Sequence, residues 1–504
     1  MRYKPDPETF AATYAAGKPQ VVWTTLVADL ETPVSAYLKL TEGRPNAFLL
    51  ESVEGGATRG RYSMIGLKPD LMWRCNGRQA FLNRRVATDP GAFEPESLDP
   101  LQSLRALLKE SAIDMPGELP PMAAGVFGYL GYDMVRLMEE LPEPNPDVLG
   151  VPDALMMRPT IMVIFDAVKD EITVITPVRP ETGLSAEAAL SRAMDRISDV
   201  VEALDRPLKK PDADATEHPA PDLVSNTSKA EFLDMVARAK NYIAAGDIFQ
   251  VVLSQRFEAP FELPPFSLYR ALRRVNPAPF LVYLDFGSFQ IVCSSPEILV
   301  RLRDGVVTIR PIAGTRPRGV TPAEDRILAE DLLADPKERA EHLMLLDLGR
   351  NDVGRVAAIG TVDVTDQFFL EYYSHVMHIV SNVEGRIAPG HDAIDALVAG
   401  FPAGTVSGAP KVRAMEIIDE LEKEKRGVYA GCVGYFGANG SMDTCIALRT
   451  SVVKDGKMYA QAGAGIVADS VPENENQECI NKARALFRAA EEAVRFASQA
   501  KRGQ

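Results

Sequence analysis

Apolar and polar positions in the second half of the chain repeat with the periods of helices and strands. Between residues 228 and 245, apolar side chains recur at helical spacing and Gly246 follows, which predicts a helix that ends there. Short apolar runs at 280–285 and 290–293 predict two strands. A helical pattern also extends from 470 to about 497. This half therefore combines long helices with short strands.

Three further strands are predicted near the C-terminus, at 429–436, 444–453 and 458–463. The dipeptides Asn439-Gly440 and Asp455-Gly456 separate them. Such pairs favour tight hairpins, because these residues tolerate the positive φ that the turns require. We therefore expect an antiparallel meander of three strands.

The first 200 residues mix strands and helices. Apolar runs at 47–50, 160–165 and 172–178 predict strands, and 185–204 has the periodicity of a helix. Taken with the predicted hairpins, this mixture indicates the α+β class, with antiparallel β-sheets flanked by helices.

One segment has the composition of a linker. Residues 206–222 are polar, rich in proline and almost without bulky apolar side chains. We therefore expect an N-terminal domain of residues 1–205 and a C-terminal domain of residues 223–504, which carries the active site.

The charge balance excludes some partners. The chain of 504 residues has 55 Lys and Arg against 70 Asp and Glu, a formal charge of −15, which argues against nucleic acid or an anionic membrane. No apolar run approaches the roughly 18 residues of a membrane span, and the N-terminus lacks the apolar core of a secretory leader. The five cysteines form no CxxC pair, which favours a reduced, cytoplasmic protein with buried thiols.

A glutamate interrupts one apolar helix face. Asp335 and Pro336 have the spacing of an N-cap and a first helical residue, and Glu338 that of a capping-box partner. Glu341 then falls on the face formed by Met344, Leu345 and Leu348. It could lie at the rim of the helix face, pair with an arginine, or bind a hard cation such as Mg²⁺, which would need a second carboxylate or substrate oxygens.

Three further features suit an anionic ligand. The turn Gly314-Thr315-Arg316 offers backbone N–H groups, a hydroxyl and a guanidinium, and Gly463-Ala464-Gly465 allows a close backbone approach. Arg449 lies among apolar residues of a predicted strand, so it needs a carboxylate from the protein or from a ligand. Because the chain is acidic overall, such local groups must attract the anion.

Other candidates have ordinary interpretations. Glu478 precedes Lys482 by four residues and lies off the apolar face, which is typical of a surface ion pair. His375 and His378 have the spacing of metal ligands, but no Cys or further His accompanies them, so zinc is disfavoured and a single acid–base histidine fits better. Residues 404–411 lack the spacing of a phosphate-binding loop.

Taken together, the motifs resemble those of the chorismate-utilising enzymes, most closely component I, the large subunit, of anthranilate synthase. They cover roughly residues 20–495 and imply a sandwich-like core of antiparallel sheets. In chain order the motifs are PIAGTRPRG, AEHLMLLDLGRND, HVMHIVS, FPAGTVSGAPKVRAMEIID, DTCIALR, QAGAGIVADS and QECINKAR.

This resemblance implies a role for each matching residue. Glu341 and Glu478 would coordinate Mg²⁺, which overrides the surface interpretation of Glu478. Glu297 would protonate the hydroxyl that leaves C4, His378 would remove a proton in the later loss of pyruvate, and Thr405 would line the same site. The residues implied in chorismate binding are Gly314, Thr315, Tyr429, Arg449, Gly463, Ala464 and Gly465.

Two positions separate the branches of this family. Aminodeoxychorismate synthases typically carry a nucleophilic lysine where this chain has Ala313, and isochorismate and salicylate synthases carry a lysine base at the position of Gln250. With neither lysine present, the resemblance implies external ammonia and the products anthranilate and pyruvate, in the first step of tryptophan biosynthesis. Aminodeoxychorismate synthesis and a silent scaffold subunit are the alternatives.

The resemblance also implies two partners. No Gly-x-Cys-x-Gly nucleophile turn is present, so a separate glutamine amidotransferase subunit, component II, would supply ammonia in a hetero-oligomer. Tryptophan would act as feedback inhibitor, bound in part by the N-terminal domain. The matching residues are Ser52, Pro279, Phe280 and Leu281, of which Leu281 replaces the usual methionine.

Overall fold

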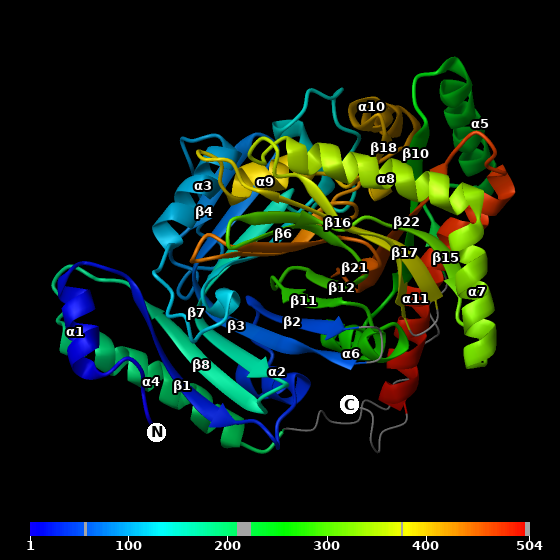
Figure 1. Ribbon diagram of the computed structural model, residues 1–504. Helices are drawn as coiled ribbons and strands as arrows, with labels where there is room; N and C mark the ends of the chain where they lie inside the picture. The colour runs from blue at the N-terminus through cyan, green and yellow to red at the C-terminus, as the bar shows by residue number, and fades with distance from the viewer. Residues whose placement is uncertain (55–57, 209–222, 374–375, 499–504) are drawn as a thin grey trace.

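The computed structural model describes residues 1–54, 58–208, 223–373 and 376–498. Its strands form one connected sheet that folds into two layers (Figure 1). The first layer runs, in order of pairing, through β10 (Gln250–Pro260), β22 (Lys457–Ile466), β21 (Thr450–Lys454), β12 (Gln290–Ser295), β11 (Phe280–Asp285) and β2 (Ala47–Glu54).

The second layer follows a different path through the chain. It runs through β6 (Gly125–Leu130), β19 (Cys432–Gly437), β20 (Met442–Ile446), β13 (Ile298–Arg303), β14 (Val306–Ile309) and β17 (Val376–Arg386), and β17 also pairs with β15 (Ile312–Pro317) and β16 (Asp363–Tyr372).

Two long strands join the layers. β3 (Thr58–Asn76) pairs with β2 of the first layer, β7 (Ala154–Asp166) pairs with β6 of the second, and the two pair with each other. Beyond β7 lie β8 (Glu171–Val178) and β1 (Gln20–Val27). The short strands are β4 (Gln79–Asn83), β5 (Glu94–Pro95), β9 (Val224–Ser225) and β18 (Gly408–Ala409).

Apolar side chains from both layers meet in the interior. Phe48 of β2 stacks on Phe127 of β6 with ring centroids 4.6 Å apart. Val282 and Cys293 of the first layer and Val433 of the second belong to the same buried cluster. This core between two sheets is the sandwich that the family resemblance implied.

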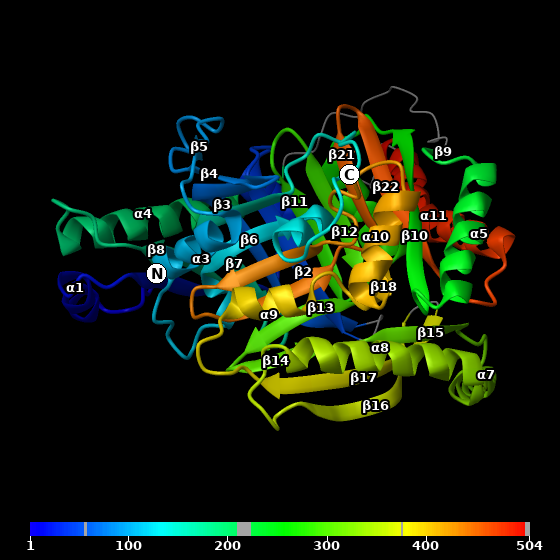
Figure 2. The same cartoon turned by 90° about the horizontal axis from the view of Figure 1, so that it is seen from above.

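Helices cover the outer faces of the sandwich (Figure 2). Over the first layer lie α5 (Lys229–Ala245), α6 (Pro265–Val275), α10 (Lys411–Leu421) and α11 (Pro472–Ser498), and over the second α3 (Pro100–Ser111), α7 (Pro322–Ala334), α8 (Pro336–Gly354) and α9 (Ala393–Gly400). Near the N-terminal strands pack α1 (Pro7–Ala15), α2 (Pro33–Thr41) and α4 (Ala186–Asp205). The predicted α+β class is confirmed.

Local helix signals are confirmed with one exception. Ser228 caps α5, which ends at Gly246 in the left-handed region with φ 84°. The Asp335 side chain caps α8 by accepting from the amides of Lys337 and Glu338. Among the described residues, however, no hydrogen bond returns from Glu338 to the cap, because its carboxylate instead accepts from Arg316 at 3.3 Å.

The predicted three-stranded meander is wrong. Its middle strand breaks at Arg449, where φ is 48°, and becomes β20 and β21. β20 pairs with β19 and β13 in the second layer, whereas β21 pairs with β22 and β12 in the first. The two predicted hairpin turns are present, but they belong to different layers.

Other expectations have mixed outcomes. All five cysteines are buried free thiols. In the described part of the chain, no helix has both the length and the apolarity to cross a membrane. Most of the predicted linker 206–222, and His375, lie outside the described residues, and the division into domains at 205 and 223 stays a prediction.

Lys411 in the 404–411 run has a structural partner. Its ammonium donates to both carboxylate oxygens of Asp352 at 2.9 and 3.0 Å, and both side chains are only 11% exposed. The pair ties the start of α10 to the last turns of α8. This contact accounts for the lysine without a phosphate ligand.

Lys411→Met should destabilise the fold by about 3 kcal/mol, because it leaves Asp352 buried and unpaired. The penalty should shrink as pH falls, since the buried carboxyl, whose pKa burial already raises, is then protonated in the folded state. Denaturant unfolding checks this. Adding Asp352→Asn should recover most of the loss, and a Lys411→Met protein as stable as the wild type would contradict the assignment.

Candidate active site

Two of the predicted site residues lie where the chain crosses between the two layers. Glu297 lies in the crossing from β12 to β13, and Arg449 lies in the crossing from β20 to β21. The Ser294 amide donates to the Arg449 carbonyl at 3.2 Å, and the Ile446 amide donates to the Glu297 carbonyl at 3.0 Å. Two segments about 150 residues apart in sequence are thereby fixed side by side.

Glu297 has the properties of a proton donor. Its side chain is buried, and burial raises its pKa to about 8, although hydrogen bonds from the Ile312 amide and Thr405 hydroxyl partly offset the shift. Thr405 Oγ1 lies 3.5 Å from Glu297 Oε1, on the one-turn helix Gly404–Val406. At neutral pH the carboxyl group is therefore mostly protonated.

His378 on β17 is held as a neutral imidazole. Its Nδ1 lies 3.1 Å from the carbonyl oxygen of Gly314 and 3.0 Å from Thr315 Oγ1. Because a carbonyl only accepts, Nδ1 carries the proton and Nε2 keeps its lone pair. Burial lowers the pKa of His378 to about 4. A bulge in β15 at Gly314, where φ is 73°, directs that carbonyl at the ring.

Arg449 supplies a cation that has no counter-ion among the described residues. Burial lowers the pKa of its guanidinium, and the positive charge of Arg449 in turn contributes to the lowered pKa of His378. Within the described ranges, no carboxylate forms an ion pair with Arg449. Of the two partners that the sequence left open, the carboxylate of a ligand fits this arrangement.

Two glycines of β22 make room for the neighbouring side chains. A Cβ atom on Gly463 would lie 2.8 Å from the Tyr429 hydroxyl, and one on Gly465 would lie 2.6 Å from Gln250 Nε2. The Gln250 amide in turn donates to Glu341 at 3.3 Å. Ala464 is fully buried in the core behind the strand, so only its backbone can face a ligand.

Glu341 and Glu478 are linked to this segment of β22 through Gln250 and Lys482. The pKa of Glu341 is raised by burial and, in smaller measure, by the charges of Glu338 and Glu478. Within the described residues, no group of three or more His, Cys, Asp or Glu is placed to hold a metal. A pair of carboxylates still fits Mg²⁺, which usually takes one or two from the protein and its other ligands from substrate and water.

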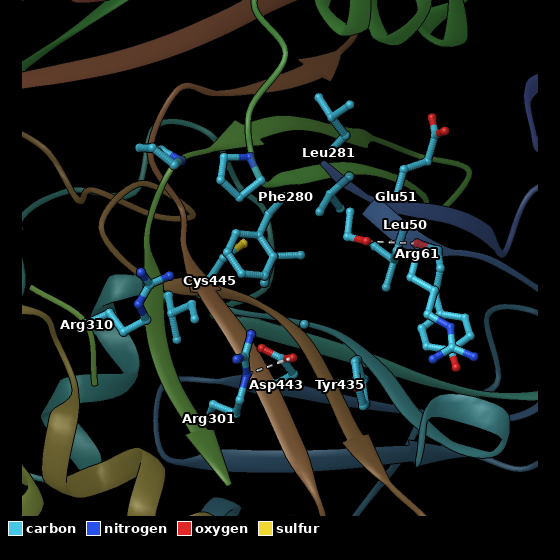
Figure 3. Close-up of a pocket in the computed structure, with 18 of the residues that line it drawn as sticks. Leu50, Glu51, Arg61, Phe280, Leu281, Arg301, Arg310, Tyr435, Asp443 and Cys445 are labelled. Atoms are coloured by element: carbon cyan, nitrogen blue, oxygen red, sulfur yellow. Dashed lines mark hydrogen bonds and ion pairs between the residues drawn. The ribbon is translucent and has the colours of Figure 1, made fainter. Parts of the chain in front are cut away.

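A cavity lies next to Glu297, whose chain neighbours Pro296 and Ile298 line it. Its volume is about 840 Å³, and Ser52, Pro279, Phe280 and Leu281 all line it. Figure 3 shows Glu51 and Leu281 directed away from the group formed by Phe280, Cys445 and Tyr435. The Leu281 side chain packs instead in the core under α6, so its departure from methionine alters that core more than the cavity.

A family model described as chorismate binding enzyme matches residues 46–488. The chain belongs to the chorismate binding enzyme family. The resemblance found in its motifs is thus confirmed.

Several relatives in this family share one description. A protein of Cereibacter sphaeroides named anthranilate synthase component 1 is 59% identical over 98% of this chain and 99% of its own. A second, from Pseudomonas putida, is 49% identical over 92% of this chain and 93% of its own.

Solved structures agree with the fold. The crystal structure of anthranilate synthase component I from Streptococcus pneumoniae TIGR4 has a TM-score of 0.75 at 38% identity, covering 92% of this chain and 99% of that chain. The menaquinone-specific isochorismate synthase of Escherichia coli, at 19% identity and TM-score 0.70, covers 96% of this chain and 100% of its own and supports the shared fold alone.

The surface ion pair that helix spacing predicted between Glu478 and Lys482 is confirmed. Lys482 forms the expected ion pair with Glu478 at 2.7 Å, and both side chains are about half exposed. Its ammonium also donates to the Gly463 carbonyl at 2.9 Å. The spacing of one helical turn from Glu478 was the available signal, because residues four apart share a face.

Gly465→Ala should lower chorismate turnover by at least tenfold, because the new methyl group forces the Gln250 amide from its place, and displacements near 1 Å can cost about a hundredfold. Steady-state kinetics and thermal unfolding measure the two effects separately. Gly117→Ala, where a Cβ meets nothing within 4 Å, is the matched control. Wild-type turnover in Gly465→Ala would show that this close approach is not required.

Proposed function

We propose that this chain is the large subunit of an anthranilate synthase. It converts chorismate and ammonia to anthranilate and pyruvate, the first step of tryptophan biosynthesis, and acts in the cytoplasm. The two relatives at 59% and 49% identity, which match nearly the whole chain, support this activity over others in the family.

The observation that carries the proposal is the lack of a protein nucleophile or base at the two positions that separate the branches. Ala313 is a buried residue of β15, and the Gln250 amide is engaged with Glu341. Neither side chain can attack the chorismate ring or activate water. The nucleophile therefore arrives from solution or from a partner, and ammonia is the one that leads to anthranilate.

Substrate binding follows from the cations and backbone donors. The Arg449 guanidinium takes one carboxylate of chorismate, since no described protein carboxylate competes for it. Lys482 approaches from α11 and the backbone of residues 463–465 from β22, and the Tyr429 hydroxyl lies against Gly463. Thr315 and Gly314 border the site from β15.

Two neutral groups move the protons. The protonated Glu297 carboxyl donates to the oxygen that leaves C4 as ammonia adds at C2. The Nε2 atom of His378, unprotonated because burial keeps the pKa of the imidazole near 4, then accepts the ring proton as pyruvate leaves. The Thr405 hydroxyl orients the acid through its contact with Oε1.

Mg²⁺ is the cofactor that we propose for the carboxylate pair. Glu341 and Glu478 would hold it, and the charge of Glu478 adds to the effects of burial and of Glu338 that raise the pKa of Glu341. When bound, the metal would offset the negative charge of the substrate carboxylate and fix its orientation.

Two regulatory and partner assignments follow. A separate glutamine amidotransferase subunit, component II, supplies the ammonia.

Tryptophan binds in the 840 Å³ cavity, where Ser52 and Phe280 are paired across β2 and β11. Pro296 and Ile298, which flank the acid Glu297, line the same cavity, so an occupant there contacts the neighbours of a catalytic residue.

The purified chain, mixed with chorismate, Mg²⁺ and ammonium salt, should produce the fluorescence of anthranilate without a second subunit. Omitting ammonium should abolish the signal, because no side chain replaces the nucleophile. Accumulation of aminodeoxychorismate would contradict the proposal in favour of the sister activity. A chain that consumes no chorismate would indicate the scaffold alternative.

The value of kcat should fall as pH rises through about 8, because Glu297 then loses the proton that it must donate. Thr405→Val should move this alkaline limb to higher pH, since the hydroxyl stabilises the charged carboxylate and lowers the pKa. A pH–rate profile of both proteins tests this. An unshifted limb in Thr405→Val would remove Glu297 as its origin.

Glu341→Gln should abolish Mg²⁺-dependent turnover and weaken Mg²⁺ binding at least tenfold while the melting temperature changes little, because it removes one of two ligand carboxylates. Calorimetric titration of Mg²⁺ in the presence of chorismate measures the binding directly. Glu330→Gln, on the exposed face of α7, is the matched control. Unchanged Mg²⁺ affinity in Glu341→Gln would remove this residue from the metal site.

A further inference from the structure

A buried arginine behind the site binds several of its segments at once. Arg426 follows α10, and its side chain is only 1% exposed. Its guanidinium donates to the Val406 carbonyl at 2.6 Å and to the Val252 carbonyl at 2.7 Å. The same group lies 5.5 Å from the ring centroid of Tyr429 and 4.8 Å from that of Tyr132.

Glu422 holds this guanidinium in place. It accepts from Arg426 Nε at 2.9 Å and from Nη2 at 2.6 Å, in a bidentate contact within the segment that follows α10. The same carboxylate accepts from the amide and hydroxyl of Ser254, each at 2.8 Å. The acid is thus bonded on both oxygens, and the whole group is buried.

Stability alone is a weak reason for such a group. Removing two charges from water costs about as much as their attraction returns, so apolar residues of similar volume often serve equally well. What apolar residues cannot do is donate in fixed directions to carbonyl groups of separate segments. The geometry of the Arg426 contacts is therefore the property to explain.

Each of these contacts is next to a residue of the active site. Val406 follows Thr405, whose hydroxyl contacts Glu297. Val252 lies in β10 two positions after Gln250, which contacts Glu341. Tyr429 places its hydroxyl over Gly463. One planar group thus contacts three segments, and neighbouring residues in these segments touch the acid Glu297, the carboxylate of Glu341 and Gly463.

We propose that Arg426, held by Glu422, is a positioning residue that fixes the Thr405 turn and Tyr429 against β10. It touches neither substrate nor metal and acts only through these neighbours. This inference rests on the proposed function, because the assay measures conversion of chorismate to anthranilate. If the wild-type protein is inactive in that assay, the proposed function fails, whereas the inference about Arg426 is tested by comparing variants with an active wild type.

Arg426→Lys is the direct test, because it keeps the buried charge for Glu422 but loses the fork that reaches both carbonyl groups. We expect kcat to fall at least tenfold, in line with the cost of small displacements. We also expect the alkaline limb of the pH–rate profile to move to higher pH, as in Thr405→Val, because the Thr405 hydroxyl no longer meets Glu297.

The matched control is Arg158→Lys. Arg158 is also buried, with a 7% exposed side chain, and it is paired with Asp70 at 2.8 Å and Glu110 at 2.9 Å in the N-terminal half, away from the site. This variant should lose a similar amount of thermal stability yet keep the wild-type kcat and pH profile. The comparison separates positioning from a general loss of stability.

A second variant covers a failure of Arg426→Lys to fold. Arg426→Ala leaves a space of guanidinium shape. Methylguanidine added to the assay should fill this space and raise turnover at least fivefold, because it returns the missing group to its place. The Arg158→Ala protein should gain nothing from methylguanidine. The inference is overturned if Arg426→Lys keeps both the wild-type kcat and the wild-type alkaline limb. It is also overturned if the loss of kcat in Arg426→Lys only matches that in Arg158→Lys.

Discussion

Two backbone hydrogen bonds between the layer crossings are the constraint on which the site depends. The Ser294 amide bonds the Arg449 carbonyl, and the Ile446 amide bonds the Glu297 carbonyl. Each crossing leaves one layer of the sandwich for the other, so neither segment could hold its side chain in place alone. Their mutual pairing fixes an acid and a cation at the same seam, and the remaining groups are added from β10, β15, β17 and β22.

Burial gives these groups the charge states that the proposed chemistry needs. The chain carries a formal charge of −15, yet the seam presents a buried guanidinium, a protonated acid and a neutral imidazole. A dianionic substrate entering such a site finds a counter-charge already in position. Burying the Arg449 guanidinium without a described partner costs desolvation free energy. Folding supplies this free energy in advance, so ligand binding does not have to.

The sequence predicted those features that depend only on residues close together in the chain, such as helix ends, caps and turns. The bounds of α5, the Asp335 cap and both hairpin turns follow from short-range rules and are confirmed. The split of the expected middle strand at Arg449 could not be read locally, because residues 444–453 are apolar enough for one continuous strand. Only the competing pairings with β12 and β13 show why the chain must turn there.

In the candidate site, too, contacts between residues distant in sequence could not be predicted from local patterns. Glu478 and Lys482 form the ion pair that helix spacing predicted, yet the Gly463 carbonyl that Lys482 also bonds belongs to β22. Family motifs named Glu297 and His378, whereas their protonation states follow from burial that no motif records. Arg426 escaped notice because two of its partners, the carbonyl groups of Val252 and Val406, are distant in sequence.

The fate of the nitrogen atom tests the central claim most directly. Chorismate would be incubated with the chain, Mg²⁺ and ¹⁵N-ammonium, and the products would be identified by mass spectrometry. The account predicts ¹⁵N-labelled anthranilate together with pyruvate. A labelled product that retains the enolpyruvyl group, or an unlabelled product hydroxylated by water, would contradict it.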